Sequence, residues 1–160
     1  MCASFTHPLT PSLGGRRTER RSYTRGMVEK QIKITRPEGL EVEVSSGAMT
    51  RLAGVSRALT GSEGIHLAIA TVPPGRCSTA HYHTNCESAI YVVSGRGLFL
   101  SGDDLQIEEA IGPGDFIYVP AEANHQPVNT SENEELVLIV ARNAPVELVV
   151  ELGGLGRKNC

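Results

Sequence analysis

Three of the five histidines in this sequence lie in two short stretches that also carry the glycines and prolines of tight turns. His81 and His83 belong to the first stretch, residues 75–95, and His125 belongs to the second, residues 114–129. Because side chains two residues apart in a β-strand point to the same face, His81 and His83 can direct their imidazoles at one point. Imidazole ligands suit a divalent first-row transition metal. The spacing therefore predicts a metal site.

The two stretches resemble the two sequence motifs of the cupin superfamily. The first motif has a glycine, a His-x-His pair, a glutamate and a second glycine, and its matches here are Gly75, His81, His83, Glu87 and Gly95. The second motif has a glycine, a proline, a histidine and an asparagine, and its matches are Gly114, Pro120, His125 and Asn129. The resemblance implies a metal ion held by His81, His83, Glu87 and His125.

The sequence departs from the cupin pattern at two positions. Seven residues rather than six separate Glu87 from Gly95, and Glu122 stands where the family usually has glycine. In a strand, one extra residue turns a side chain to the other face unless a bulge or the preceding turn absorbs it. We expect Glu87 to be the fourth ligand, and the alternative is a surface carboxylate beside an all-histidine site. Cys86 faces opposite to Glu87 in a strand, so we do not expect it to be a ligand.

Three neutral imidazoles and one carboxylate leave one or two positions open on a five- or six-coordinate ion, where substrate or oxygen can bind. Fe(II), Mn(II), Ni(II), Cu(II) and Zn(II) all accept such ligands, and Fe(II) is our first expectation for the single bound ion.

Other polar and aromatic residues are candidates for roles around the ion. Tyr91 and Tyr118 are the candidate catalytic residues, although such rings more often belong to the core. Arg96 and Arg142 would bind an anionic substrate if they reached the mouth of the barrel. We interpret His66, which lies outside both motifs, as structural.

The elements that must position these residues read as short strands separated by turn signals. Apolar or alternating runs span residues 40–45, 65–72, 89–93, 98–100, 105–108, 116–119 and 136–140. Many short strands at near-regular spacing predict a sandwich or barrel. We therefore expect an all-β fold, an antiparallel double-stranded β-helix of the jelly-roll or cupin-barrel type. Helical periodicity is weak everywhere, and the best helix candidate is residues 46–59.

The 160 residues are enough for one globular domain. Residues 1–26 hold five arginines against a single glutamate and lack a periodic apolar pattern, so we expect a flexible basic arm. The alternatives are an organellar targeting peptide or an extension upstream of a start at Met27. Residues 27–160 are expected to form a single cupin β-barrel domain, with the motif core at about 40–145.

Charge and cysteine content restrict the partners. Residues 27–160 carry ten Lys+Arg against seventeen Asp+Glu, a net charge of −7, which argues against nucleic acid. No apolar run approaches the roughly 20 residues that span a bilayer, so we expect no membrane partner. Cys2, Cys77, Cys86 and Cys160 show no C-x-x-C spacing, and we expect free thiols in the cytoplasm. Organellar import through the basic arm is the alternative.

The resemblance to cupins also implies a function. It implies a metal-dependent enzyme for a small organic substrate, of the dioxygenase, isomerase, decarboxylase or lyase type. The alternatives are a non-catalytic sensor or carrier of metal or a small molecule, and a metal-free structural cupin. Apolar residues on both faces of the strands at 89–93 and 136–140 predict a homodimer, because the outer face needs a second covering.

Overall fold

Strands dominate the part of the chain that the computed structural model describes, residues 31–44 and 46–158. The chain divides by its contacts into Met1–Ile32 and Lys33–Cys160, and every strand of the described residues lies in the second unit. The arm predicted at residues 1–26 lies outside the described residues.

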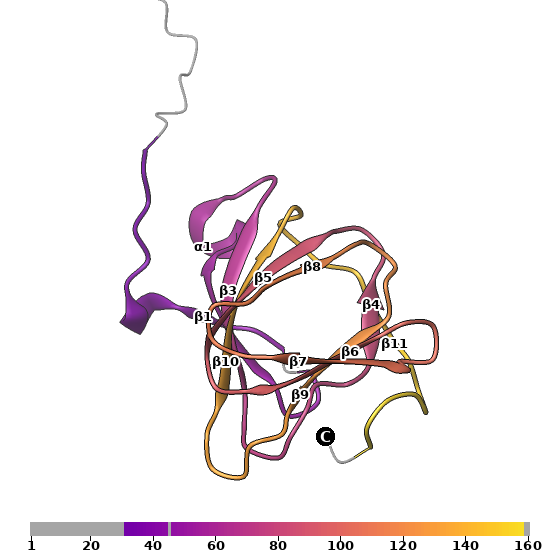
Figure 1. Ribbon diagram of the computed structural model, residues 1–160. Coiled ribbons are helices and arrows are strands. Elements are labelled where there is room, and N and C mark those ends of the chain that lie inside the picture. Colours follow the sequence, from indigo (N-terminus) through magenta and orange to yellow (C-terminus); the bar gives the residue numbers. More distant parts are fainter. Residues whose placement is uncertain (1–30, 45, 159–160) are drawn as a thin grey trace, which may run out of the picture. The chain divides into compact units, whose positions relative to one another are not determined.

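Two antiparallel sheets face each other (Figure 1). The six-stranded sheet has, in spatial order, β1 (Glu41–Val42), β2 (Thr50–Val55), β3 (His66–Val72), β10 (Leu136–Arg142), β5 (Ser88–Ser94) and β8 (Phe116–Val119). The five-stranded sheet has β11 (Val149–Glu151), β4 (His81–His83), β9 (His125–Asn129), β6 (Gly97–Ser101) and β7 (Ile107–Ile111). The expectation of an all-β antiparallel fold is confirmed.

The segment predicted as the best helix candidate, residues 46–59, is mostly strand. Residues 50–55 form β2, which pairs with β1 on one side and β3 on the other. Only a four-residue helix follows, α1 (Arg57–Thr60), whose N-cap Ser56 accepts a hydrogen bond from the Leu59 N–H. A single-turn 3₁₀ helix, η1 (Pro37–Gly39), precedes β1. Pairing with two neighbours outweighs a weak local helical tendency, and Gly54 lowers that tendency further.

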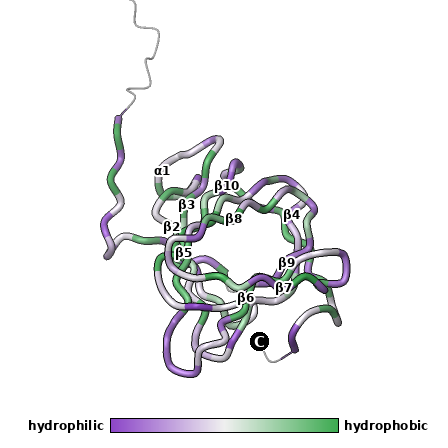
Figure 2. Tube along the Cα trace, in the orientation of Figure 1, coloured by the Kyte–Doolittle hydropathy of each residue, from purple (hydrophilic) through white to green (hydrophobic). Residues whose placement is uncertain are grey.

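The core lies between the sheets and is built by residue alternation. Along β10 the side chains alternate between buried and half-buried, and Leu136 and Leu138 are almost fully buried. Val72 and Val92 contact the same cluster from the neighbouring strands. The hydropathy colouring follows these strands as hydrophobic stretches (Figure 2).

The outer face of the six-stranded sheet is also apolar. Tyr91, Val93, Phe116 and Tyr118 point outward from β5 and β8, and Phe116 is 83% exposed. The Tyr91 and Phe116 rings contact each other with their centroids 4.9 Å apart. The strands at 89–93 and 136–140 therefore carry apolar residues on both faces, as the sequence predicted.

Two further expectations concern cysteines and membranes. Cys86 is a free, buried thiol, whereas Cys77 is disulfide-bonded, so the expectation of free thiols is wrong for Cys77. The helices among the described residues are too short to cross a membrane.

Candidate metal centre

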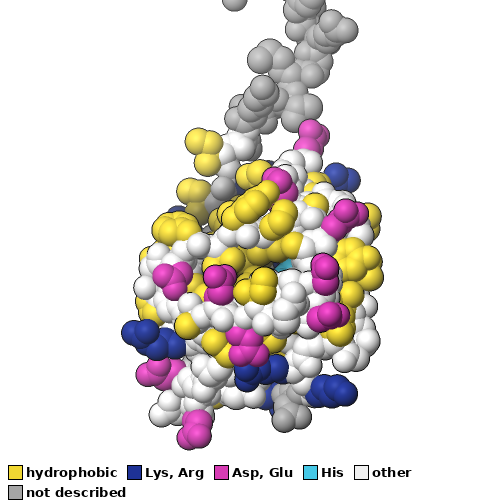
Figure 3. Space-filling view, turned by 45° about the vertical axis from the view of Figure 1, so that its right-hand side comes forward, with side chains coloured by type: hydrophobic (Ala, Val, Ile, Leu, Met, Phe, Trp, Pro, Cys, Tyr) yellow, Lys and Arg dark blue, Asp and Glu magenta, His cyan; other side chains and the backbone are white. Residues whose placement is uncertain are grey.

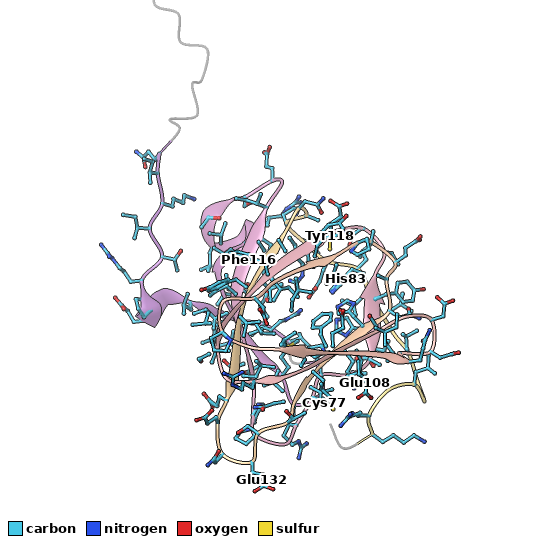
Figure 4. The ribbon with its side chains drawn as sticks, viewed as in Figure 1. Cys77, His83, Glu108, Phe116, Tyr118 and Glu132 are labelled. Carbon is cyan, nitrogen blue, oxygen red and sulfur yellow. The ribbon has the colours of Figure 1, made fainter. Side chains whose placement is uncertain are left out.

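Three buried histidines come together between the sheets. His81 and His83 lie at the two ends of β4, and His125 begins β9, directly opposite His81 in the strand register. One nitrogen from each ring lies within 4.8 Å of those of the other two. His83 points into the space enclosed by the strands (Figure 4), and a small histidine surface shows among hydrophobic side chains in Figure 3. The two motifs thus meet, as the sequence predicted.

Hydrogen bonds orient two of the three rings. His81 Nδ1 lies 2.7 Å from the Thr79 carbonyl oxygen, and His125 Nδ1 lies 2.8 Å from the Ala123 carbonyl oxygen. A carbonyl oxygen only accepts, so Nδ1 carries the proton in both rings. Nε2 is then the unprotonated nitrogen that remains for an ion, which is the usual arrangement of metal-binding histidines.

Burial keeps these imidazoles neutral. It lowers the pKa of His83 to about 4, with Arg142 adding to the effect, and lowers the pKa of His125 to about 3, with His81 adding to it. The pKa of His81 is also below its usual value because of burial. A neutral imidazole is the form that binds a metal, so the site is ready for an ion at neutral pH.

Glu122, which stands where the cupin pattern usually has glycine, lies in the turn before His125. Glu122 adopts φ of 64°, the left-handed conformation that glycine adopts at low cost. Its N–H donates to the His83 carbonyl oxygen at 2.8 Å, which ties the turn to β4. The Phe99 ring stacks on His125 at a centroid distance of 5.8 Å and belongs to the apolar core.

Glu87 does not join the histidines. Its side chain is exposed and accepts hydrogen bonds from the Tyr118 hydroxyl at 2.7 Å and from Asn143 Nδ2 at 3.2 Å. The buried positions of β5 begin at Ser88 and continue at every second residue, so the extra residue before Gly95 turns Glu87 outward. Ser88, 4% exposed, takes the inward position. The seven-residue spacing was the sequence signal for this outcome.

The candidate catalytic tyrosines also lie away from the histidines. Tyr91 and Tyr118 belong to the outward-facing set of β5 and β8, and the Tyr118 hydroxyl contacts Glu87. Alternation along each strand sends these side chains away from the interior. Cys86 is buried but is not part of the histidine group.

A ring of charged and polar side chains lies next to the histidines, and we call it the ion-pair ring. Its members come from the chain after β1, from β2, β3 and β10, and from the loop before β11, and they are Glu43, Arg51, His66, Arg142 and Glu147. Arg51, His66 and Arg142 are each less than 9% exposed.

The first half of the ring joins His66, Glu43 and Arg51. His66 Nε2 donates to Glu43 Oε1 at 2.6 Å, and Glu43 Oε2 lies 3.4 Å from Arg51 Nε. Arg142 Nη1 lies 3.4 Å from His66 Nδ1, which fits a ring that donates through Nε2 and accepts at Nδ1. Burial alone would raise the pKa of Glu43, but the hydrogen bond from His66 and the positive charges of Arg51 and Arg142 outweigh it and lower the pKa. His66, which lies outside both motifs, is thus a member of this ring.

The second half of the ring holds Glu147. Arg51 Nη2 contacts one carboxylate oxygen of Glu147, and Arg142 Nη2 lies 3.0 Å from the other. That second oxygen, Oε2, also lies 3.2 Å from His83 Nδ1. Burial raises the pKa of Glu147, but Arg142 and Arg51 outweigh it and hold the pKa below its usual value. Glu147 is thus ionised and joins the ring to the histidine group.

A cavity of about 700 Å³ opens beside this arrangement. Its lining includes His81 from the histidine group and every member of the ion-pair ring. Of the two arginines considered for substrate binding, Arg142 lines this cavity and Arg96 is exposed elsewhere.

Sequence reasoning missed Glu43, Arg51 and Glu147. They lie outside both motifs, and Arg51 lies in the segment predicted as a helix. No local sequence pattern marks these three residues. Glu147 is about 100 positions away from Glu43 and Arg51 in the chain, and only the pairing of distant strands brings them together.

The donor set fits a divalent transition metal. It offers three convergent neutral imidazoles, and no carboxylate of the described residues lies in the same group. Such a set leaves several coordination positions for other ligands. An ion there would act as a Lewis acid or a redox centre.

Comparisons with known proteins agree with this geometry. Residues 68–142 match the family model described as the cupin domain, a range that includes all three histidines. The comparison with curated protein sequences found no match.

Solved structures share the fold. The polyketide cyclase RemF from Streptomyces resistomycificus is 19% identical, with a TM-score of 0.64 over 81% of this chain and 89% of its own. A Bacillus subtilis oxalate decarboxylase, in work on its Mn(II) centres, is 26% identical, with a TM-score of 0.58 over 69% of this chain. The formate complex of the Lactobacillus farciminis oxalate decarboxylase is 20% identical, with a TM-score of 0.61 over 72% of this chain. This chain covers only 29% and 34% of these two decarboxylases. The matches confirm the predicted double-stranded β-helix.

Proposed function

We propose that this chain, whose residues 68–142 match the cupin domain, is a metal-dependent enzyme acting on a small organic substrate. The observation that carries the proposal is the convergence of three neutral, buried imidazoles beside a cavity of about 700 Å³. The reaction would be of the dioxygenase, isomerase, decarboxylase or lyase type. His81, His83 and His125 would hold the ion, and the Mn(II) of a similar protein supports a divalent first-row metal.

The charge of the site favours an anionic substrate. Three neutral imidazoles leave the two positive charges of the ion without a carboxylate ligand, because Ser88 stands where a carboxylate would face inward. A small carboxylic acid would supply both the negative charge and the oxygen atoms that such an ion binds. We therefore expect small organic acids to be the first class of substrate to test.

Metal reconstitution followed by a substrate screen tests the proposal. The purified protein would be loaded with Fe(II) or Mn(II), and oxygen uptake and carbon dioxide release would be followed with a panel of small organic acids. We expect turnover that disappears on chelation and in His81→Ala, because that variant loses a ligand. Unchanged turnover in His81→Ala would place the chemistry elsewhere.

A non-catalytic binding module is the second candidate. It is favoured by one observation, that the candidate catalytic residues Tyr91 and Tyr118 lie on the outer face. A metallated protein that binds an organic acid tightly but leaves it unchanged in the same screen would support this alternative.

We also propose that the chain forms a homodimer through the outer face of the six-stranded sheet. Phe116 and its neighbour Tyr91 form an exposed aromatic pair there, which a second copy would cover. Sedimentation equilibrium of Phe116→Glu tests this, with Ile107→Glu on the other sheet as the matched control. We expect a monomer only for Phe116→Glu, and a monomeric wild-type protein at high micromolar concentration would exclude the dimer.

A further inference from the structure

We propose that Glu147 is a positioning residue of the metal centre, which holds the His83 ring with Nε2 directed at the ion. This inference rests on the proposed metal centre, because the role of Glu147 is to orient a metal ligand. The orientation of the His83 ring itself can be measured without the ion. Glu147 lies outside both sequence motifs, in the loop between β10 and β11.

The three histidines differ in what their Nδ1 atoms contact. His81 and His125 each donate to a backbone carbonyl two residues earlier, so their own strands orient them. His83 Nδ1 is buried and makes no aligned hydrogen bond, and the oxygen it faces is Glu147 Oε2 at 3.2 Å. His83 is therefore the one ring of the three whose orientation depends on a side chain distant in sequence.

Glu147 is itself held from two sides. Arg51 contacts one of its oxygens, and Arg142 lies 3.0 Å from the other, so the two arginines restrict rotation of the carboxylate. In metal sites, a carboxylate next to the Nδ1–H of a histidine ligand fixes the orientation of the ring and makes its opposite nitrogen a stronger metal ligand. Its negative charge also lies next to a site that has no carboxylate ligand.

The backbone around Glu147 is fixed to the strand that carries His83. Val149 pairs with His83 in the register of β11 and β4, and the Thr84 N–H donates to the Leu148 carbonyl oxygen at 2.9 Å. The Asn85 side chain bonds both neighbours of Glu147, donating to the Val146 carbonyl oxygen at 2.9 Å and accepting from the Leu148 N–H at 2.8 Å. The loop thus presents Glu147 to His83 by main-chain contacts on both sides.

Glu147→Gln is the test substitution, and Glu43→Gln is the matched control. Glutamine has the shape of glutamate, but its side chain has only one acceptor oxygen. In the wild type, His83, Arg51 and Arg142 share the two carboxylate oxygens of Glu147. Glu43→Gln removes the same charge from the same ion-pair ring, and Glu43 contacts Arg51 and His66 but not His83. A loss of fold stability is therefore common to both variants, whereas an effect on His83 is expected for Glu147→Gln alone.

The first measurement uses the metal-free protein. Nitrogen-15 NMR of the histidine rings reports the proton on His83 Nδ1, with the signal identified by its loss in His83→Gln. We expect this proton signal to move upfield or disappear in Glu147→Gln and to stay in place in Glu43→Gln. An unchanged His83 signal in Glu147→Gln, or an equal change in both variants, would overturn the proposal.

The second measurement is metal affinity, obtained by titration with Mn(II) or Co(II). Loss of a partner that orients a ligand typically costs about 10- to 100-fold in affinity, and we expect a loss of this size in Glu147→Gln. Glu43→Gln should stay within about threefold of the wild type, and equal losses in the two variants would contradict the proposal. If the wild type binds no metal while the His83 signal still depends on Glu147, the positioning role stands and the proposed function fails.

Discussion

The two ends of the interior face of β3 and β10 bury opposite kinds of side chain. At one end Val72 pairs with Leu136, and both are fully buried aliphatic residues. At the other end His66 pairs with Arg142, and both belong to the ion-pair ring. The aliphatic end stabilises the fold by burying apolar surface, whereas the charged end must compensate each buried charge with a partner. We therefore expect the aliphatic end to contribute most to the stability of the fold, and the charged end to serve the chemistry of the neighbouring histidine group.

The largest effect is expected from His125→Ala, in the histidine group next to the charged end. This substitution removes one of three convergent imidazoles, and we expect the remaining pair to bind an ion too weakly to retain one equivalent. Elemental analysis should find no bound metal, while circular dichroism should still report a β-rich fold because the aliphatic end is untouched. His66→Ala is the control, since His66 is buried nearby but outside the histidine group, and it should keep its metal. One tightly bound equivalent in His125→Ala would contradict the proposed site.

Leu138→Ala should produce the opposite result at the aliphatic end. Leu138 is 1% exposed, and replacing a buried leucine by alanine lowers the free energy of unfolding by about 2–5 kcal/mol. Urea unfolding measures this loss, and the folded variant should still bind one equivalent of metal. Ile107→Ala, at a position 49% exposed, is the control and should change stability by less than about 0.5 kcal/mol. Loss of metal from a folded Leu138→Ala protein would show that the two ends are not separable.

Acid should destabilise the metal-free protein through its charged end. Burial holds the pKa of His83 at about 4 and that of His125 at about 3, so both stay neutral in the fold while the unfolded chain binds protons below its usual pKa of 6.5. Each extra proton bound by the unfolded chain lowers stability by about 1.4 kcal/mol per pH unit. The lowered pKa values of Glu43 and Glu147 act in the same direction below their usual value of 4.5.

Urea unfolding at intervals from pH 7 to pH 4 measures this loss of stability. The free energy of unfolding should fall steadily below pH 6.5, and His125→Ala should show a shallower slope. A flat profile would mean that the histidines are not buried as the structure has them.

The smallest effect is expected from Glu87→Ala. The Glu87 side chain is exposed and contacts Tyr118 and Asn143 on the outside of the sheet, so metal affinity should remain within about twofold of the wild type. The same titration that tests Glu147→Gln measures it. A tenfold loss would instead mean that Glu87 turns inward when the ion binds, which would restore the ligand set that the cupin resemblance implied.

Much of the fold and part of the site follow from local sequence patterns. The apolar runs at residues 136–140 and 89–93 predicted strands that carry apolar residues on both faces, because composition and the two-residue period of a strand are local properties. The His-x-His spacing predicted that His81 and His83 share a face, for the same reason. The second motif supplied His125, and the two motifs meet in the structure.

Local patterns failed where pairing between distant strands decides the outcome. Residues 50–55 became a strand because β1 and β3 lie on either side, which no helical or strand period within the segment reveals. The direction of Glu87 depended on where β5 begins, and that is set by its pairing with β10 and β8. One residue of offset was enough to send the carboxylate outward and Ser88 inward.

The sequence by itself therefore determined an all-β chain with three histidines able to bind a metal, because strand period and motif spacing are local. Only the tertiary structure decided which carboxylate accompanies them. Glu147 reaches His83 because β11 pairs with β4, and Arg51 and Arg142 hold it because β2, β3 and β10 lie side by side. These contacts join residues that are far apart in the chain, so their energy depends on the complete fold and leaves no pattern in any short segment.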